Sequence, residues 1–250
     1  MQSGGKKITD VKTYYCGYCV NNMHRIYKGA PKETRRFPAM AVRFLHNGEL
    51  YLFDTGYSSR VFEYGWRSKI YHWINPIVFD RHNSLKEQLA SDGINPGDVK
   101  GIVLSHLHPD HIGGLPDFPD SRIIVSRNTY LTLRNHKLLD VVFPNLIPQD
   151  FENRVDVLDF AEEYDFFNDG SVILKDISGH TNGQIGMLLS EHNTFYAADS
   201  CWGTDLWNSP MRFAARLLQK DFGAYQKTIE KVKQMQAAGI EIVVSHEARK

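Results

Sequence analysis

The sequence predicts an α/β protein in which two mixed β-sheets lie face to face with helices outside, an αββα sandwich. Two observations carry this prediction. The expected strands combine a hairpin with strand–helix–strand connections, which together indicate mixed sheets covered by helices. The 250 residues contain no linker-like stretch, so we expect one domain over 1–250, with a Gly- and Lys-rich start, Met1–Lys7, that is flexible.

The first expected strands form a hairpin. An apolar run over Ala39–His46 meets Asn47-Gly48, a dipeptide typical of a type I′ turn, and Glu49–Phe53 is the return strand. Asp54-Thr55-Gly56 follows directly, so we expect Asp54 at the end of a strand.

Helix and strand signals alternate through the rest of the chain. Ser84 is expected to cap a helix, with Glu87 completing a capping box and Gly93 ending the helix. An amphipathic pattern predicts a helix over Asp221–Ala238, which Gly239 ends. The remaining expected elements are a helix over Asn128–His136 and short strands over Val99–Ser105, Arg122–Val125, Val155–Leu158, Val172–Ile177, Gln184–Leu189, Thr194–Ala198 and Ile240–Val244.

Composition excludes several classes of partner. Lys+Arg and Asp+Glu both number 29 and no basic stripe stands out, so we expect no nucleic-acid partner. The balanced charge gives little support for a membrane-surface role, and no run approaches the ~20 apolar residues that cross a bilayer, so we expect no membrane partner. The lack of an apolar leader, with only three cysteines, predicts a reduced, cytoplasmic protein. Cys16 and Cys19 form a lone C-x-x-C with no second pair for a zinc site.

Four side chains that bind metals gather within six residues, at His106-Leu107-His108-Pro109-Asp110-His111. In an extended loop, residues two positions apart point the same way, so His106 and His108 can hold one ion together. Asp110 and His111 come at the next turn and can face a neighbouring ion. Zinc accepts imidazole nitrogen and carboxylate oxygen, so the pattern predicts a metal site. Histidines that merely cap helices or sit half-buried do not cluster in this way.

Further candidate ligands follow expected strands. His106, His180, Asp199 and His246 each stand just past the end of one. Strand ends at one edge of a sheet converge in space, and binding sites form there. We therefore expect these side chains to meet in one site.

The order of these motifs resembles the metallo-β-lactamase superfamily. The resemblance rests on the His-x-His-x-Asp-His motif, Gly179-His180-Thr181, Asp199, His246 and the earlier Phe53-Asp54-Thr55-Gly56, and it covers about Pro38 to Glu247. Within the superfamily the chain looks most similar to the N-acyl homoserine lactone lactonases, whose helix, strand and metal loop Leu85–Gly114 resembles.

The resemblance implies a role for each candidate. A first zinc ion would bind to His106, His108 and His180, and a second to Asp110, His111 and His246. Asp199 would bridge both ions, and Asp54 would brace the loop by hydrogen bonds. Zinc is the expected metal, and other divalent transition metals stay open. A hydroxide shared by two ions would attack a lactone, ester or thioester, and Asp110 would pass a proton to the leaving group.

Two other functions stay open beside this hydrolase. A phosphodiesterase of the same fold is one, because two metals suit displacement at phosphorus. A metal-bearing binding or regulatory protein with little turnover is the other. One departure bears on the choice: many lactonases of this group carry a tyrosine three residues after the bridging aspartate, where this chain has Trp202. An indole donates one hydrogen bond but is no acid.

Seven aromatic side chains lie between Tyr57 and Phe79, within an insert over 57–83. They form either a lid over the metals or a packing or dimer contact, and the sequence does not choose between these. As a lid, the segment would contribute Tyr57 and Trp66 to substrate binding, opposite Trp202 and Phe213. The expected partner is then a small-molecule substrate with an apolar part, and a homodimer stays open.

Overall fold

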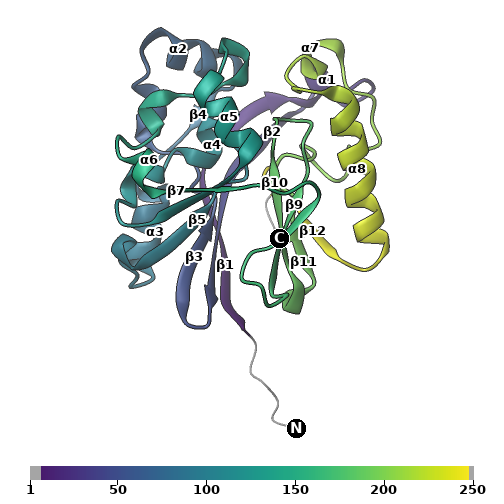
Figure 1. Cartoon of the computed structure of the whole chain (residues 1–250). Coiled ribbons are helices and arrows are strands. Elements are labelled where there is room, and N and C mark those ends of the chain that lie inside the picture. Colours follow the sequence, from purple (N-terminus) through teal and green to yellow (C-terminus); the bar gives the residue numbers. More distant parts are fainter. Residues whose placement is uncertain (1–6, 248–250) are drawn as a thin grey trace.

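Two β-sheets packed face to face, with helices on both outer faces, make up the computed structural model, which describes residues 7–247 (Figure 1). One sheet has seven strands in the order β4-β1-β2-β3-β5-β6-β7, and the other has five in the order β12-β11-β10-β9-β8. The predicted αββα sandwich is confirmed. Of the start that we expected to be flexible, residues 1–6 lie outside the described residues.

The predicted hairpin consists of β2 (Thr34–His46) and β3 (Glu49–Phe53), which pair antiparallel. Asn47 and Gly48 between them have φ of 50° and 86°, as a type I′ turn requires. The hairpin is therefore confirmed, although β2 begins at Thr34 and not at Ala39.

The long apolar run of β2 is explained by burial on both faces. Ala39 and Ala41 point into the core between the larger sheet and its helices. Met40, Val42 and Phe44 point the other way, into the core between the two sheets. A strand buried on both faces needs no polar residue at alternate positions, so its apolar run is continuous.

The longest strand, β1 (Ile8–Asn22), was not predicted. It pairs antiparallel with β2 and with the short β4 (Ile77–Val78), but its register against β2 shifts twice. Asp10 and Gly17 lie at these shifts with φ of 50° and 81°. Each bulge resets which side chains face the core, so the alternation that identifies a strand is lost.

The other strands lie close to their predicted positions, except for β4 and β8, which were not predicted. In the larger sheet β3, β5, β6 and β7 run parallel. Their bounds are β5 (Val99–Val103), β6 (Arg122–Ser126) and β7 (Val155–Leu158). The smaller sheet contains β8 (Glu163–Asp165), β9 (Val172–Asp176), β10 (Ile185–Leu189), β11 (Thr194–Tyr196) and β12 (Glu241–Val243).

The three predicted helices are confirmed as α3 (Leu85–Ser91), α5 (Arg127–Asn135) and α8 (Phe222–Ala237). Ser84 accepts the Glu87 backbone N–H at the start of α3. The remaining helices are α1 (Met23–Ile26), α2 (Gly65–Ile74), α4 (Pro109–Ile112), α6 (Phe151–Arg154) and α7 (Phe213–Arg216). Single 3₁₀ turns are η1 (Ser59–Phe62), η2 (Arg81–Asn83), η3 (Pro96–Asp98), η4 (Leu115–Asp117), η5 (Leu138–Asp140), η6 (Pro144–Leu146) and η7 (Ser190–His192).

Within residues 7–247, every helix is too short or too polar to cross a membrane.

Candidate ligands follow the ends of four strands. His106 comes shortly after β5, His180 after β9, Asp199 after β11 and His246 after β12. Strands from both sheets thus end around one point, and the loops that follow them supply the site.

Gly179 lets the loop before His180 lie directly on the start of α8. Its φ is 138°, and a Cβ atom at this position would overlap with the Tyr225 backbone nitrogen. The Asp221 and Lys220 backbone N–H groups donate to the carbonyls of Gly179 and His180, at 2.9 and 3.0 Å. This close approach holds His180 against the N-terminal end of α8.

We expect Gly179→Ala to lower the free energy of unfolding by about 1–3 kcal/mol more than Gly170→Ala does. Gly170 is the matched control, because its φ of 75° is also positive but nothing lies within 4 Å of the place that a Cβ atom would take there. Urea denaturation of the two variants measures the difference. Equal losses would mean that backbone conformation alone, and not the contact with α8, requires the glycine.

Candidate metal centre

The first group of candidate ligands consists of His106, His108 and His180. Their ligand atoms lie within 4.8 Å of one another. The His180 Nε2 and His108 Nδ1 atoms are 3.0 Å apart, and the His106 ring centroid is 4.6 Å from that of His108. The three imidazoles therefore face one point between them.

The second group consists of Asp110, His111, Asp199 and His246, again with ligand atoms within 4.8 Å. The Asp199 Oδ2 atom lies 2.9 Å from His246 Nε2, and its Oδ1 lies 3.1 Å from His111 Nε2. Asp199 Oδ2 is also 3.4 Å from His180 Nε2 of the first group. Asp199 therefore stands between the two groups, which form one continuous cluster of seven side chains.

Outer oxygen atoms orient the imidazole rings. His180 Nδ1 donates to Gln219 Oε1 at 2.8 Å, and His246 Nδ1 donates to the Pro38 carbonyl at 2.9 Å. His111 Nδ1 donates to Asp54 Oδ2 at 2.7 Å. Because Nδ1 of each ring donates to an outer oxygen, Nε2 is the atom that faces the centre, and in the neutral ring its lone pair can bind a metal ion.

Asp54 connects the loop after β3 to the metal-binding motif. It accepts hydrogen bonds from the Ser105 backbone N–H and hydroxyl, both at 2.7 Å, besides that from His111. Asp54 and Ala198 have φ of 59° and 41°, which is unfavourable for residues other than glycine. Strain of this kind occurs at functional sites, where the surrounding structure holds it. Here Asp54 is itself a hydrogen-bond partner of the motif, and Ala198 directly precedes Asp199.

Burial keeps the first group of imidazoles neutral. It lowers the pKa of His106 and His108 well below the usual value, and it also lowers the pKa of His180. The neighbouring imidazoles lower the pKa of His106 and His108 further. Neutral imidazole is the form that binds a metal ion.

The second group carries opposite charges. Burial alone would lower the pKa of His111 and His246, but the Asp54 carboxylate beside His111, and Asp199 beside both, raise it. Burial opposes ionisation of Asp199 as well, yet the charges of His246 and His111 hold its pKa well below the usual range. The buried carboxylates thus require positive charge, which protons or a metal ion can supply.

The donor set fits metal ions. His106 Nε2 is buried and has no hydrogen-bond partner among the described residues, while His111 Nε2 and Asp199 Oδ1 have only each other, at 3.1 Å. Buried polar atoms without partners are rare, because each costs free energy. Imidazole nitrogen and carboxylate oxygen are zinc ligands, and a centre that shares Asp199 has room for two ions.

A cavity of about 240 Å³ opens beside His108 and His180. Its apolar wall consists of Leu139, Leu217 and Leu218, and the sequence did not point to any of them. Gln219, which orients His180, was also missed. These residues come from η5 and from the segment after α7, so no local pattern could have placed them beside His180.

The four residues expected to bind substrate are dispersed. Trp202 is half-buried, with its ring centroid 6.0 Å from that of His180. Tyr57 is buried in the core, where its hydroxyl lies 3.2 Å from that of Tyr71. Trp66 and Phe213 are 59% and 75% exposed. The cavity beside His180 is lined by none of these four.

The three cysteines are free and buried. Burial raises the pKa of Cys16 and Cys201 to about 12 and raises that of Cys19 as well. A thiol with such a pKa stays protonated at neutral pH and is a poor nucleophile.

Related proteins are similar in sequence to part of this chain. N-acyl homoserine lactonase AiiB of Agrobacterium fabrum (strain C58 / ATCC 33970) is 26% identical over 194 residues, which are 73% of this chain and 69% of that protein. N-acyl homoserine lactonase AttM of the same strain is 29% identical over 140 residues, 52% of each. The matched part is thus about half of AttM.

Solved structures share the fold over nearly the whole chain. An N-acyl homoserine lactone hydrolase with N-hexanoyl-L-homoserine at its catalytic metal center superposes with a TM-score of 0.76 at 16% identity, covering 96% of this chain and 94% of that one. AidC, a dizinc quorum-quenching lactonase, superposes with a TM-score of 0.70 at 17% identity, covering 96% and 88%.

The family itself is defined by sequence. The profile of the metallo-beta-lactamase superfamily matches residues 36–245, which include six of the seven candidate ligands and Asp54, and His246 follows directly. With the fold and the His/Asp clusters described above, this match means that the chain belongs to the metallo-beta-lactamase superfamily.

Proposed function

We propose that this chain is a metal-dependent hydrolase that opens a lactone, ester or thioester with an apolar part, and that N-acyl homoserine lactones are the first substrates to test. The observation that carries the proposal is the convergence of the two ligand groups on Asp199. The relatives named as lactonases support this choice of substrate class.

The proposed ligands follow the two groups. His106, His108 and His180 would hold one ion. Asp110, His111 and His246 would hold the second, and Asp199 would contact both. Two zinc ions, when bound, supply a hydroxide at neutral pH and polarise a carbonyl group.

The chain's own side chains orient the substrate and move the proton. Asp110 is buried, with Oδ2 3.6 Å from His246 Nε2, so we propose that its carboxylate would take up the proton of the attacking hydroxide and pass it to the leaving alkoxide or thiolate. Trp202 lies near His180 and can donate its indole N–H to a substrate oxygen, but it cannot supply a proton. The cavity between Leu139 and Leu217 would take the apolar part.

The zinc-loaded protein is expected to release one proton for each N-acyl homoserine lactone that it opens, because hydrolysis at neutral pH yields a carboxylate. His106→Ala should lose this activity, with lower metal content by mass spectrometry. His136→Ala is the matched control, since His136 lies outside the centre with Nδ1 near the Leu133 carbonyl. If the wild-type protein has both metal positions filled and releases no proton, N-acyl homoserine lactones are excluded as substrates. Thioesters, other esters and phosphodiesters would then be tested.

Asp54→Asn should weaken binding of one metal ion by about 10- to 100-fold, the usual effect of removing an oxygen that orients a ligand. The new amide would place either a donor or an uncharged acceptor against the His111 N–H. Titration against a chelator measures the affinity. Asp169→Asn is the control, because Asp169 pairs with His46 in the same way, at 3.0 Å, outside the centre. Equal affinities in the two variants would contradict the bracing role.

Leu139→Ser combined with Leu217→Ser should raise KM for long-chain lactones by about tenfold and leave KM for short-chain lactones nearly unchanged. The two side chains form the apolar wall beside His108 and His180. Leu131→Ser is the control, because Leu131 is exposed and lies outside this cavity. If KM stays the same at every chain length, the apolar part binds elsewhere.

A further inference from the structure

The outer face of α2 is apolar. Trp66, Ile70, Trp73 and Ile74 occur at positions i, i+4, i+7 and i+8 of the helix, which places them on one face. All four are exposed, and Trp73 is 81% exposed. The stripe that normally faces the core of a surface helix here faces outward.

Basic side chains flank this stripe. Arg67 and Lys69 lie on its two sides at helical spacing, and the face opposite the stripe contains Ser68 and Tyr71, which pack inward. From residue 64 to residue 79 the sequence has no Asp or Glu. An apolar face with Trp, bordered by cations, is typical of helices that lie in a membrane interface.

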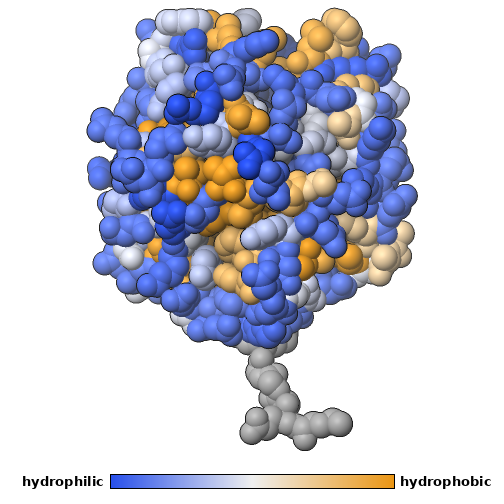
Figure 2. Space-filling view, viewed as in Figure 1, coloured by the Kyte–Doolittle hydropathy of each residue, from blue (hydrophilic) through white to orange (hydrophobic). Residues whose placement is uncertain are grey.

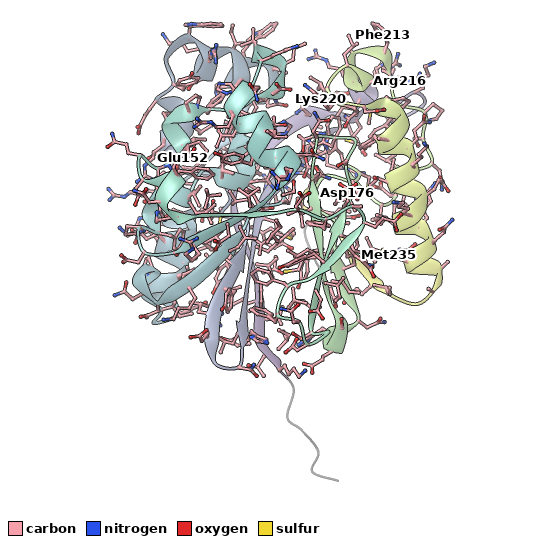
Figure 3. All side chains as sticks on the ribbon, in the orientation of Figure 1. Glu152, Asp176, Phe213, Arg216, Lys220 and Met235 are labelled. Atoms are coloured by element: carbon pink, nitrogen blue, oxygen red, sulfur yellow. The ribbon has the colours of Figure 1, made fainter. Side chains whose placement is uncertain are left out.

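A second segment of the same character lies across the molecule. Phe213, Leu217 and Leu218 are exposed, with Arg216 and Lys220 beside them. Both α2 and α7 lie at the end of the molecule opposite the start of β1 (Figure 1). Figure 2 shows hydrophobic side chains gathered at the top right, over α7. In Figure 3, Phe213 and Arg216 project at this top end, while Lys220 lies lower and nearer the centre.

A third segment lies between these two. Leu138 and Leu139 of η5 are exposed, next to Lys137, and Leu139 faces Leu217 across the cavity that reaches His180. Phe143, a few residues later, packs with its ring 5.4 Å from that of Tyr71 on the inner side of α2. The segment of η5 thus lines the cavity together with the residues after α7, and through Phe143 it also adjoins the inner side of α2. We call the exposed apolar residues of the three segments the entrance surface.

Three stretches of sequence in this region are basic. Residues 64–79, 127–139 and 206–220 together contain eight Lys and Arg and no Asp or Glu, in a chain whose charges balance. Arg127, Arg134 and Lys220 pair with carboxylates from other segments. The cations for which the structure describes no ion pair are Arg67, Lys69, Lys137, Arg212 and Arg216.

We propose that the entrance surface docks on a lipid bilayer with anionic headgroups. Tryptophan and other apolar side chains enter the interface, and the unpaired cations contact the headgroups. A second copy of the chain is a poorer occupant, because a twofold interface brings the same patch of both copies together and would set one basic border against another.

This docking would bring the cavity between Leu139 and Leu217 to the lipid surface, from which an apolar substrate can enter. The proposal departs from the expectation of no membrane partner, which rested on net charge and on the lack of a spanning segment. Neither property reports how a folded surface distributes its side chains. The docking itself does not depend on the proposed hydrolysis, so its test needs no substrate.

The experiment measures binding of the full chain to vesicles of phosphatidylcholine alone and of phosphatidylcholine with phosphatidylglycerol, at low and high salt. We expect binding only to the anionic vesicles, weakened by salt. Trp73→Ser with Ile74→Ser, and separately Arg67→Glu with Lys69→Glu, should each weaken binding at least about tenfold. Lys227→Glu with Lys231→Glu, exposed cations of α8, is the matched control and should reduce binding much less.

Two results would overturn the docking proposal. One is equal binding of the wild type to both kinds of vesicle, or none. The other is a dimer, detected by light scattering, that dissociates in the Trp73→Ser/Ile74→Ser variant while no vesicle binding occurs. Circular dichroism checks that the variants fold. Hydrolysis of a short-chain lactone in vesicle-free buffer measures the proposed hydrolase activity separately. A failure of the proposed function can therefore be distinguished from a failure of the docking proposal.

Discussion

The structure depends on one electrostatic constraint: the carboxylates of Asp54, Asp110 and Asp199 are buried together and need positive charge beside them. Five imidazoles surround them, of which His111 and His246 have raised pKa values because of Asp199. Such a cluster costs free energy to bury unless cations complete it. Divalent ions would do so while leaving the first group of imidazoles neutral, which is their state in the buried site.

The fold keeps the buried ligands in place because different parts of the chain hold them. Loops after strands of both sheets supply them, and oxygens of Asp54, Gln219 and Pro38 orient three of the rings. This arrangement includes local backbone strain, because Asp54 and Ala198 adopt a positive φ. The same rigidity would keep the ligands in place during turnover, since rigid elements position sites more accurately than free loops do.

The rim of the site differs in character from its interior. Inside, polar side chains form the two ligand groups, whereas outside, Trp73, Phe213 and Leu139 are strongly exposed. Exposed apolar residues in a connected region usually mark a partner surface. The aromatic segment that the sequence left undecided divides accordingly: Tyr57 and Tyr71 pack in the core, and Trp66 and Trp73 point outward. It is partly core packing and partly surface, since a helix presents two faces.

The sequence alone determined the elements whose signals are local. The turn at Asn47-Gly48, the cap at Ser84, the end of α8 shortly before Gly239 and the six-residue His/Asp motif each depend on neighbours in the chain, so their patterns could be read directly. The bulges of β1, the contact of Gln219 with His180 and the cavity between Leu139 and Leu217 were decided only by tertiary structure. Each of these joins residues far apart in sequence, or breaks the period of two. Such contacts leave no local periodicity, because they arise only when the sheets and helices pack.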